Sequence, residues 1–177
     1  MEIPIKELVE RTSARARVSF VLAVAERVIG TLRYDSAGYS KAVDALDLAW
    51  NWVETGKVTG SELYELLENE EDTGLLIHEW EAGEDEARTS AWICVTTAIA
   101  YASWHAYQRR NERAMPEPIC EVSERAVSNV VEYASRTKNF DEDFVRRVCV
   151  YLISREQTVC FDSEGGSIER ALLAKLS

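Results

Sequence analysis

The carboxylates of this chain are concentrated in segment 58–87, VTGSELYELLENEEDTGLLIHEWEAGEDEA. The segment holds eleven acidic side chains and neither Lys nor Arg. The whole chain has 31 acids and 20 bases, so its formal net charge of -11 equals the number of acids in this one segment. Clustered carboxylates can bind cations, transfer protons or attract a basic protein surface.

Metal binding is the first of these possibilities, and the spacing of the ligands argues against it. The segment lacks the D-x-[DN]-x-[DN]-G loop of a calcium site. The two histidines, His78 and His105, form none of the pairs HxxxH, HExxH or ExxH that place two ligands on one helix face. We therefore expect no metal ligands and no cofactor.

Catalysis by a nucleophile is the second possibility. The four cysteines show no CxxC spacing, and three of them lie in apolar helical or near-helical surroundings, where a free thiol behaves as a small hydrophobic group. His105, in the sequence WHAY, is better explained as a buried or half-buried histidine than as a ligand. His78 lies among acids, which favours its charged form without making it catalytic. We expect no catalytic residue and no enzyme activity.

Helices must position these residues, because the apolar periodicity is helical along the chain. Ser13 or Thr12 begins a helix whose apolar stripe runs from Val18 to Leu32. After Gly38 and Ser40, a second helix carries Val43, Leu46, Trp50 and Val53 and stops at Gly56. Thr59 and Glu62 have the spacing of a capping box, which predicts a third helix, and a short segment from Leu75 to Trp80 ends at Gly83.

A long helix over about 84–111 is predicted next, because this stretch has no Gly or Pro and is apolar almost all round between Ala91 and Ala102. It should carry Trp92, Ile99 and Trp104 into the core. Three further helices are expected over 122–135, 141–155 and 167–176, and a short turn is expected after Pro4. These patterns predict an all-α fold, a bundle of six to eight helices around the long apolar helix, as one domain over 1–177.

The remaining composition limits where the protein acts and what it binds. No apolar run reaches the ~20 residues that cross a bilayer, and acids mixed with the bases near the N-terminus argue against a signal peptide. The cysteine pattern is typical of a reducing compartment, so we expect a cytoplasmic protein. The acidic surface would repel phosphates, so nucleic acid is not expected to be a direct partner.

Recognition of a basic protein accounts best for the acidic segment. Like charges three or four residues apart destabilise a helix, and here no interspersed Lys offsets that cost. Tyr64 and Trp80 are of the types that are enriched at the centres of interfaces. The predicted partner-binding residues are Glu62, Tyr64, Glu65, Glu68, Glu70, Glu71, Asp72, Glu79, Trp80, Glu81, Glu84 and Asp85, together with Trp52.

The sequence also resembles a known family at ALDLAWNWVETGK, Ala45 to Lys57, and at GSELYELLENEEDTGL, Gly60 to Leu75. These stretches, followed by a long helix with tryptophans, are similar to the all-helical immunity-protein family numbered six of bacterial polymorphic toxin systems. The resemblance covers about the first two-thirds of the chain. It implies a cytoplasmic antitoxin that binds and neutralises a cognate toxin domain without an activity of its own.

Three questions stay open from the sequence. A helical enzyme or small-ligand module with a carboxylate-lined cleft is one alternative, and a dimeric adaptor or regulator is another. The toxin is expected to have a basic, nuclease-like surface, but its identity and the oligomeric state of the free protein are undetermined. Trp50 continues a core stripe, whereas Trp52 lies about 200° around the same helix and is either a second core residue or a contact residue.

Overall fold

The computed structural model describes residues 3–69, 73–110, 114–156 and 166–176, and these are all helix, turn or loop. The elements, in chain order, are α1 Ile5–Arg11, α2 Ala14–Val28, the 3₁₀ helix η1 Ile29–Tyr34, α3 Ser36–Thr55, α4 Gly60–Leu67, α5 Leu75–Glu81, α6 Glu86–Arg110, α7 Glu117–Cys120, α8 Arg125–Ala134, α9 Glu142–Glu156 and α10 Arg170–Ala174. The all-α class is therefore confirmed. Of the α-helices in the described ranges, eight have seven residues or more.

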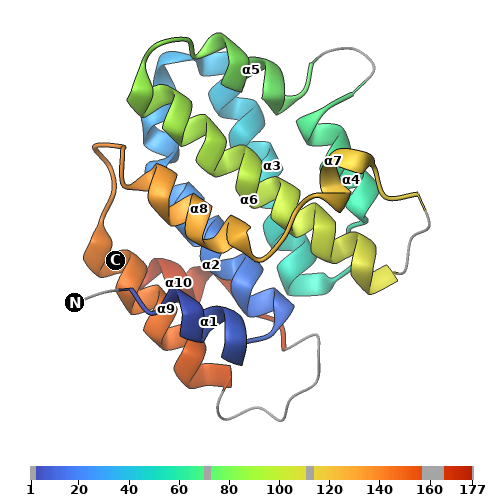
Figure 1. The fold of residues 1–177 in the computed structure, drawn as a ribbon, viewed down its shortest axis with the longest axis vertical. Helices are drawn as coiled ribbons and strands as arrows, with labels where there is room; N and C mark the ends of the chain where they lie inside the picture. The colour runs from blue at the N-terminus through green and yellow to red at the C-terminus, as the bar shows by residue number, and fades with distance from the viewer. Residues whose placement is uncertain (1–2, 70–72, 111–113, 157–165, 177) are drawn as a thin grey trace.

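Helix α6 is the axis of the bundle, as its apolar sequence predicts (Figure 1). It contacts α2, α3, α4, α5, α7, α8 and η1. Trp92 and Ile99 are fully buried on it, whereas Trp104, which was expected in the core, is half-buried. Helices α1, α9 and α10 gather at one end of the molecule, and α4 and α5 lie at the opposite side (Figure 1). None of the described helices is both long and apolar enough to span a membrane.

The predicted helix ends are confirmed wherever a side chain or a glycine fixes them. Ser13 caps α2 by accepting from the backbone N–H of Ala16. Gly56 ends α3 with φ of 66°, in the left-handed region that favours glycine. Thr59 and Glu62 form the capping box of α4, in which the Glu62 carboxylate accepts from the Thr59 backbone N–H at 2.7 Å. The cap anchors the first turn of the acidic helix.

We predict that Thr59→Ala lowers the free energy of unfolding by about 1 kcal/mol, because it leaves a helical N–H without its acceptor. Urea denaturation should show a lower midpoint than that of the wild type. Ser61→Ala, at an exposed position in the same turn, is the control and should leave the midpoint nearly unchanged. Equal midpoints for Thr59→Ala and Ser61→Ala would show that the box does not stabilise α4.

Two predicted helix starts are wrong, each for a local reason. Helix α3 begins at Ser36 and runs through Gly38, because Asp35 caps it by accepting from the Gly38 N–H at 2.9 Å. A Cβ at Gly38 would lie 2.8 Å from His78 Nδ1, so glycine serves close packing there. The last helix begins at Arg170 instead of Ser167, because the chain first buries Ile168 completely.

Candidate functional site

Helices α4 and α5 present the acidic residues of segment 58–87 on one side of the bundle. Glu65 and Glu68 are exposed on and just after α4, and Glu81, Glu84 and Asp85 are exposed on and after α5. Glu70, Glu71 and Asp72 lie outside the described residues. Among the described residues, no side chain bonds to the carboxylates of Glu65, Glu81 and Glu84. As far as the described ranges extend, these three carboxylates are open to a partner.

Other acids of the predicted set already have partners within the chain. Glu62 is held in the capping box, and bonds from the backbone and the hydroxyl of Thr59 lower its pKa. Asp85 accepts from the Arg88 backbone N–H at 3.1 Å and pairs with the Arg88 side chain. Glu68 accepts a hydrogen bond of 2.7 Å from Tyr64 Oη, and that bond raises the pKa of Tyr64 to about 12. Local structure therefore explains part of the acidic sequence.

Helix α5 also exposes apolar side chains among these acids. Trp80 is 84% exposed, and Leu76 and Ile77, one turn before it, are 41% and 37% exposed. On a helix, positions 76, 77 and 80 share one side. Exposed aromatic and aliphatic groups surrounded by charges are typical of a protein-binding surface.

A hollow of ≈ 260 Å³ separates α5 from α4 and is closed behind by α6 and α7. Leu76 and Glu79 of α5, Tyr64, Leu67 and Glu68 at α4, and Ile93, Thr96, Thr97, Ala100, Pro118 and Ile119 line it. We call it the Glu79 hollow. Tyr64 and Glu68 also line an open groove along α4 with Glu62 and Glu65. The hollow and the groove thus share two lining residues, and together with Leu76, Ile77, Trp80, Glu81 and Glu84 they form what we call the α4–α5 surface.

Glu79 is the half-buried acid of this surface. Burial raises the pKa of its carboxyl, and a hydrogen bond of 2.5 Å with the Thr96 hydroxyl opposes that effect. The sequence predicted Glu79 as a contact residue but did not predict that its side chain is half-buried. The spacing from Leu75 and Leu76 could have indicated it, since position 79 shares their side of α5.

We predict a pH-dependent stabilisation by Glu79→Gln. The folded-state pKa of Glu79 lies above the ordinary value of 4.5, so its contribution favours folding at low pH and is lost as the pH rises through the raised value. Glutamine keeps a partner for Thr96 and carries no charge. The melting temperature of the variant, relative to wild type, should therefore be higher at pH 7 than at pH 4.

Glu65→Gln is the control for that measurement, because Glu65 is exposed. Its melting temperature relative to wild type should be nearly equal at the two pH values. A Glu79→Gln difference that does not change between pH 4 and pH 7 would show that the burial of Glu79 has no energetic cost.

Trp52 does not belong to the surface, and its prediction as a contact residue is corrected. It is 2% exposed and packs with its ring centroid 6.5 Å from that of His105. Trp50, on the same helix, is equally buried. Both are accommodated because α3 is covered on more than one side, by α2, α4, α5, α6 and η1.

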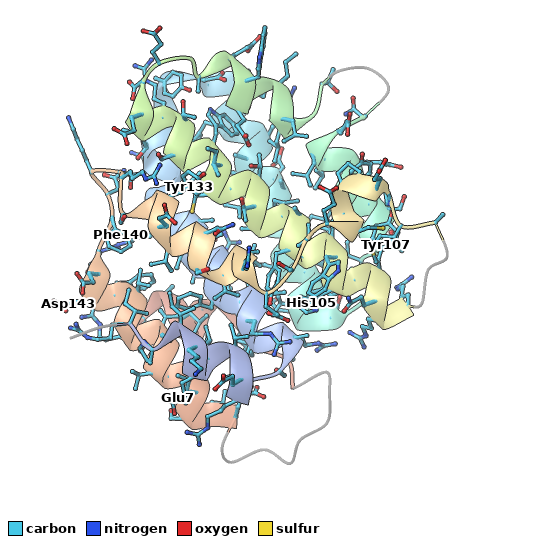
Figure 2. All side chains as sticks on the ribbon, viewed as in Figure 1. Glu7, His105, Tyr107, Tyr133, Phe140 and Asp143 are labelled. Atoms are coloured by element: carbon cyan, nitrogen blue, oxygen red, sulfur yellow. The ribbon has the colours of Figure 1, made fainter. Side chains whose placement is uncertain are left out.

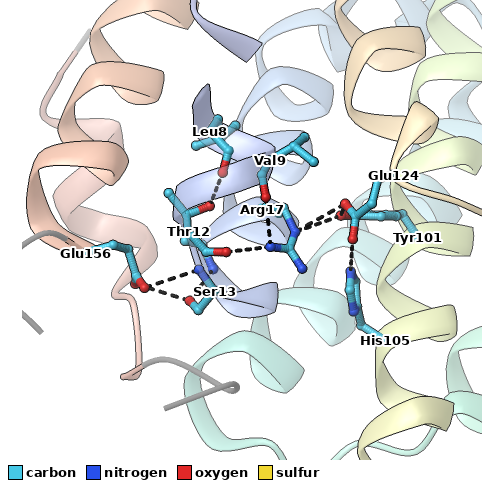
Figure 3. A network of polar contacts seen from close by, with 10 residues as sticks. Leu8, Val9, Thr12, Ser13, Arg17, Tyr101, His105, Glu124 and Glu156 are labelled. Carbon is cyan, nitrogen blue, oxygen red and sulfur yellow. Dashed lines mark hydrogen bonds and ion pairs between the residues drawn. The ribbon is translucent and has the colours of Figure 1, made fainter. Parts of the chain in front are cut away.

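Sequence reasoning also missed a half-buried polar network of Arg17, Tyr101 and Glu124 (Figure 3). Arg17 Nε of α2 lies 3.2 Å from Glu124 Oε2, which also accepts from Tyr101 Oη of α6. His105 Nε2 lies 4.0 Å from Glu124 Oε1, beyond hydrogen-bonding distance. Burial, and then the charge of Arg17, lowers the pKa of His105 to about 3, so the ring is neutral. The network ties α2, α6 and the start of α8 together.

The structure places the two histidines on different helices. His105 is on the C-terminal half of α6 (Figure 2), and its ring contacts those of Tyr101 and Trp104. His78 of α5 stacks on Trp92, and its Nδ1 lies 2.8 Å from Asp35 Oδ2. Within the described ranges, no three His, Cys, Asp or Glu side chains are grouped so that they could hold a metal ion.

Comparison with known proteins gives one match. A family model described as Immunity protein Imm6 matches residues 16–137. This range runs from α2 to just beyond α8 and includes all of α4, α5 and α6. Neither the curated proteins nor the solved structures contain a significant match to the chain.

Proposed function

The chain belongs to the Imm6 family of immunity proteins, and from this premise we propose that it neutralises a cognate toxin by binding a basic face of it with the α4–α5 surface. Family membership implies a protein that acts against a toxin. We propose further that the α4–α5 surface is the binding site for the toxin and that the chain has no catalytic role.

The observation that carries this proposal is Trp80, which is 84% exposed on the acidic side of the bundle. Leu76 and Ile77 extend the exposed apolar area beside it, and tryptophan is among the residues that contribute most to binding energy at interfaces. Glu81 flanks it directly, and Glu65 and Glu68 lie across the Glu79 hollow. Charge steers the encounter, and the apolar residues then anchor the complex.

The charge of the surface supports a cationic partner. Carboxylates within about one screening length of each other, ~8 Å at physiological salt, reinforce one another at close range. A toxin that acts on nucleic acid must expose a basic surface to bind phosphates, and an acidic helical protein can cover it. We propose a nuclease-like toxin domain as the partner, bound in the cytoplasm of the protected cell.

A small-ligand or enzyme function would require perturbed acids to meet in one cleft. Two described carboxyl groups, Glu26 and Glu79, have a pKa raised by burial. Glu26 pairs with Arg170, which also bonds to Asp47, and it does not line the Glu79 hollow. This separation favours the binding function over the alternative.

The test is co-expression with the toxin domain encoded beside the gene of this protein. Each neighbouring C-terminal toxin domain is expressed in bacteria with and without the chain, and survival is scored. We expect rescue from one toxin domain and a stable complex of the purified pair. Survival unaffected by the chain for every neighbouring toxin, with no complex formed, would contradict the proposed function.

A further inference from the structure

We infer that one Lys or Arg side chain of the toxin inserts into the Glu79 hollow. This inference rests on the proposed function and adds the contact that fixes the orientation of the partner. The hollow is smaller than the ~300–1,000 Å³ typical of small-molecule sites, at ≈ 260 Å³. It is open to solvent beside Leu76 on the exposed side of α5.

The walls of the hollow suit the stem of a long basic side chain. Leu67, Leu76 and Ile93 present apolar groups on three of its sides, and Ala100 and Ile119 complete the lining. Lys and Arg place their methylene stems along apolar surfaces while the charged end seeks polar partners. A carboxylate or a phosphate would find no cation here, because none of the described lining residues is basic.

The polar groups of the hollow suit the charged end. Glu79 lies inside with its bond to Thr96, and Glu68 lies on the α4 side, held by Tyr64. Burial of Glu79 without a cation disfavours its charged form, and a cation beside it would restore that form. The hollow therefore has a carboxylate that is only partly stabilised by the free protein. A cation of the partner is the group that would stabilise this carboxylate fully.

Two substitutions separate the charge of the hollow from its shape. Glu79→Gln removes the charge with little change in size, and Ala100→Leu fills the space while leaving every carboxylate in place. Glu142→Gln is the control, because it removes one exposed charge on α9, outside the α4–α5 surface. Binding of each variant to the purified toxin domain is measured by calorimetry, and folding is checked by thermal melting.

We expect Glu79→Gln and Ala100→Leu to weaken binding about tenfold or more, and Glu142→Gln to weaken it by less than about twofold. Each exposed Lys and Arg of the toxin is then changed to Met and combined with Glu79→Gln. For one of these toxin residues, the change to Met should weaken binding to the wild-type chain but not to Glu79→Gln, because the ion pair is already absent in that variant. No toxin residue should show such coupling with the control variant Glu142→Gln.

Several results would overturn the inference while leaving the proposed function intact. In the first, Glu79→Gln and Ala100→Leu bind the toxin with wild-type affinity, whereas charge reversal of Glu65, Glu81 and Glu84 abolishes binding. Another is a stable dimer of the free protein that Ala100→Leu dissociates, which would make a second copy of the chain the occupant. If charge reversal also leaves binding unchanged, both the inference and the proposed function fail.

Discussion

Replacing Glu65, Glu81 and Glu84 together by Lys is expected to abolish protection against the toxin while leaving the fold intact. The three carboxylates are exposed, and no described side chain bonds to them. The change replaces three negative charges by three positive ones on the α4–α5 surface. Attraction to a basic partner then becomes repulsion, and the association rate at low salt should fall about 100-fold or more, the range over which charge steers protein encounters.

A matched triple reversal on other elements is the control for this prediction. Glu10→Lys, Glu132→Lys and Asp143→Lys change the net charge equally but lie on α1, α8 and α9, with Asp143 at the end of the molecule remote from α5 (Figure 2). This variant should retain protection and most of its association rate. Equal loss for the two triple variants would show that net charge matters and the α4–α5 surface does not. High salt should reduce the wild-type rate toward that of the α4–α5 variant.

Trp52→Ala is expected to cause a large loss of stability. Removing a fully buried Trp leaves a cavity and costs about 3–5 kcal/mol. The ring lies 2% exposed and stacks on His105, so its loss also loosens the contact of α3 with α6. For a chain of this size the melting temperature should fall by at least about 6 °C.

Trp80→Ala is the matched comparison, because it removes the same side chain from a position that is 84% exposed. Its stability should stay within about 0.5 kcal/mol of wild type. Its affinity for the toxin should fall by about 2 kcal/mol or more, as for a binding hot spot. The opposite outcome, with Trp52→Ala stable and Trp80→Ala unfolded, would invert the assignment of the two tryptophans.

Sequence reasoning predicted the elements where local chemistry determines them. The Thr59 and Glu62 spacing, the stop at Gly56 and the apolar run of α6 depend on residues within one or two turns, so they can be read from the sequence. The same holds for the inward positions of α9, where Val145, Val148, Cys149 and Leu152 are all buried. That the chain forms one domain over 1–177 stays a prediction.

Features that depend on distant segments were not predictable in this way. The burial of Trp52 requires α6 to lie beside a second side of α3, which the period of α3 does not specify. Arg17, Tyr101 and Glu124 come from three parts of the chain, and each alone resembles an ordinary polar position. The Glu79 hollow likewise exists only after α4, α5, α6 and α7 meet.

The candidate binding surface was predictable from the sequence only in part. Its acidity was evident from the sequence, because eleven acids without a base are a local property. Which acids already have charged or capping partners within the chain was not, since Glu62 is used by a cap and Asp85 by Arg88. The structure therefore narrows the proposed contacts to the exposed acids of the α4–α5 surface and to Glu79.

Site-specific photo-crosslinking tests the binding surface most directly. A photoreactive phenylalanine analogue is placed at position 80 on α5 or at position 150 on α9, where Val150 is 52% exposed on another part of the bundle. Irradiation of the complex with the purified toxin domain should give a covalent adduct from position 80 and none from position 150. An adduct from position 150, with none from position 80, would place the toxin on α9 instead of the α4–α5 surface and contradict the account.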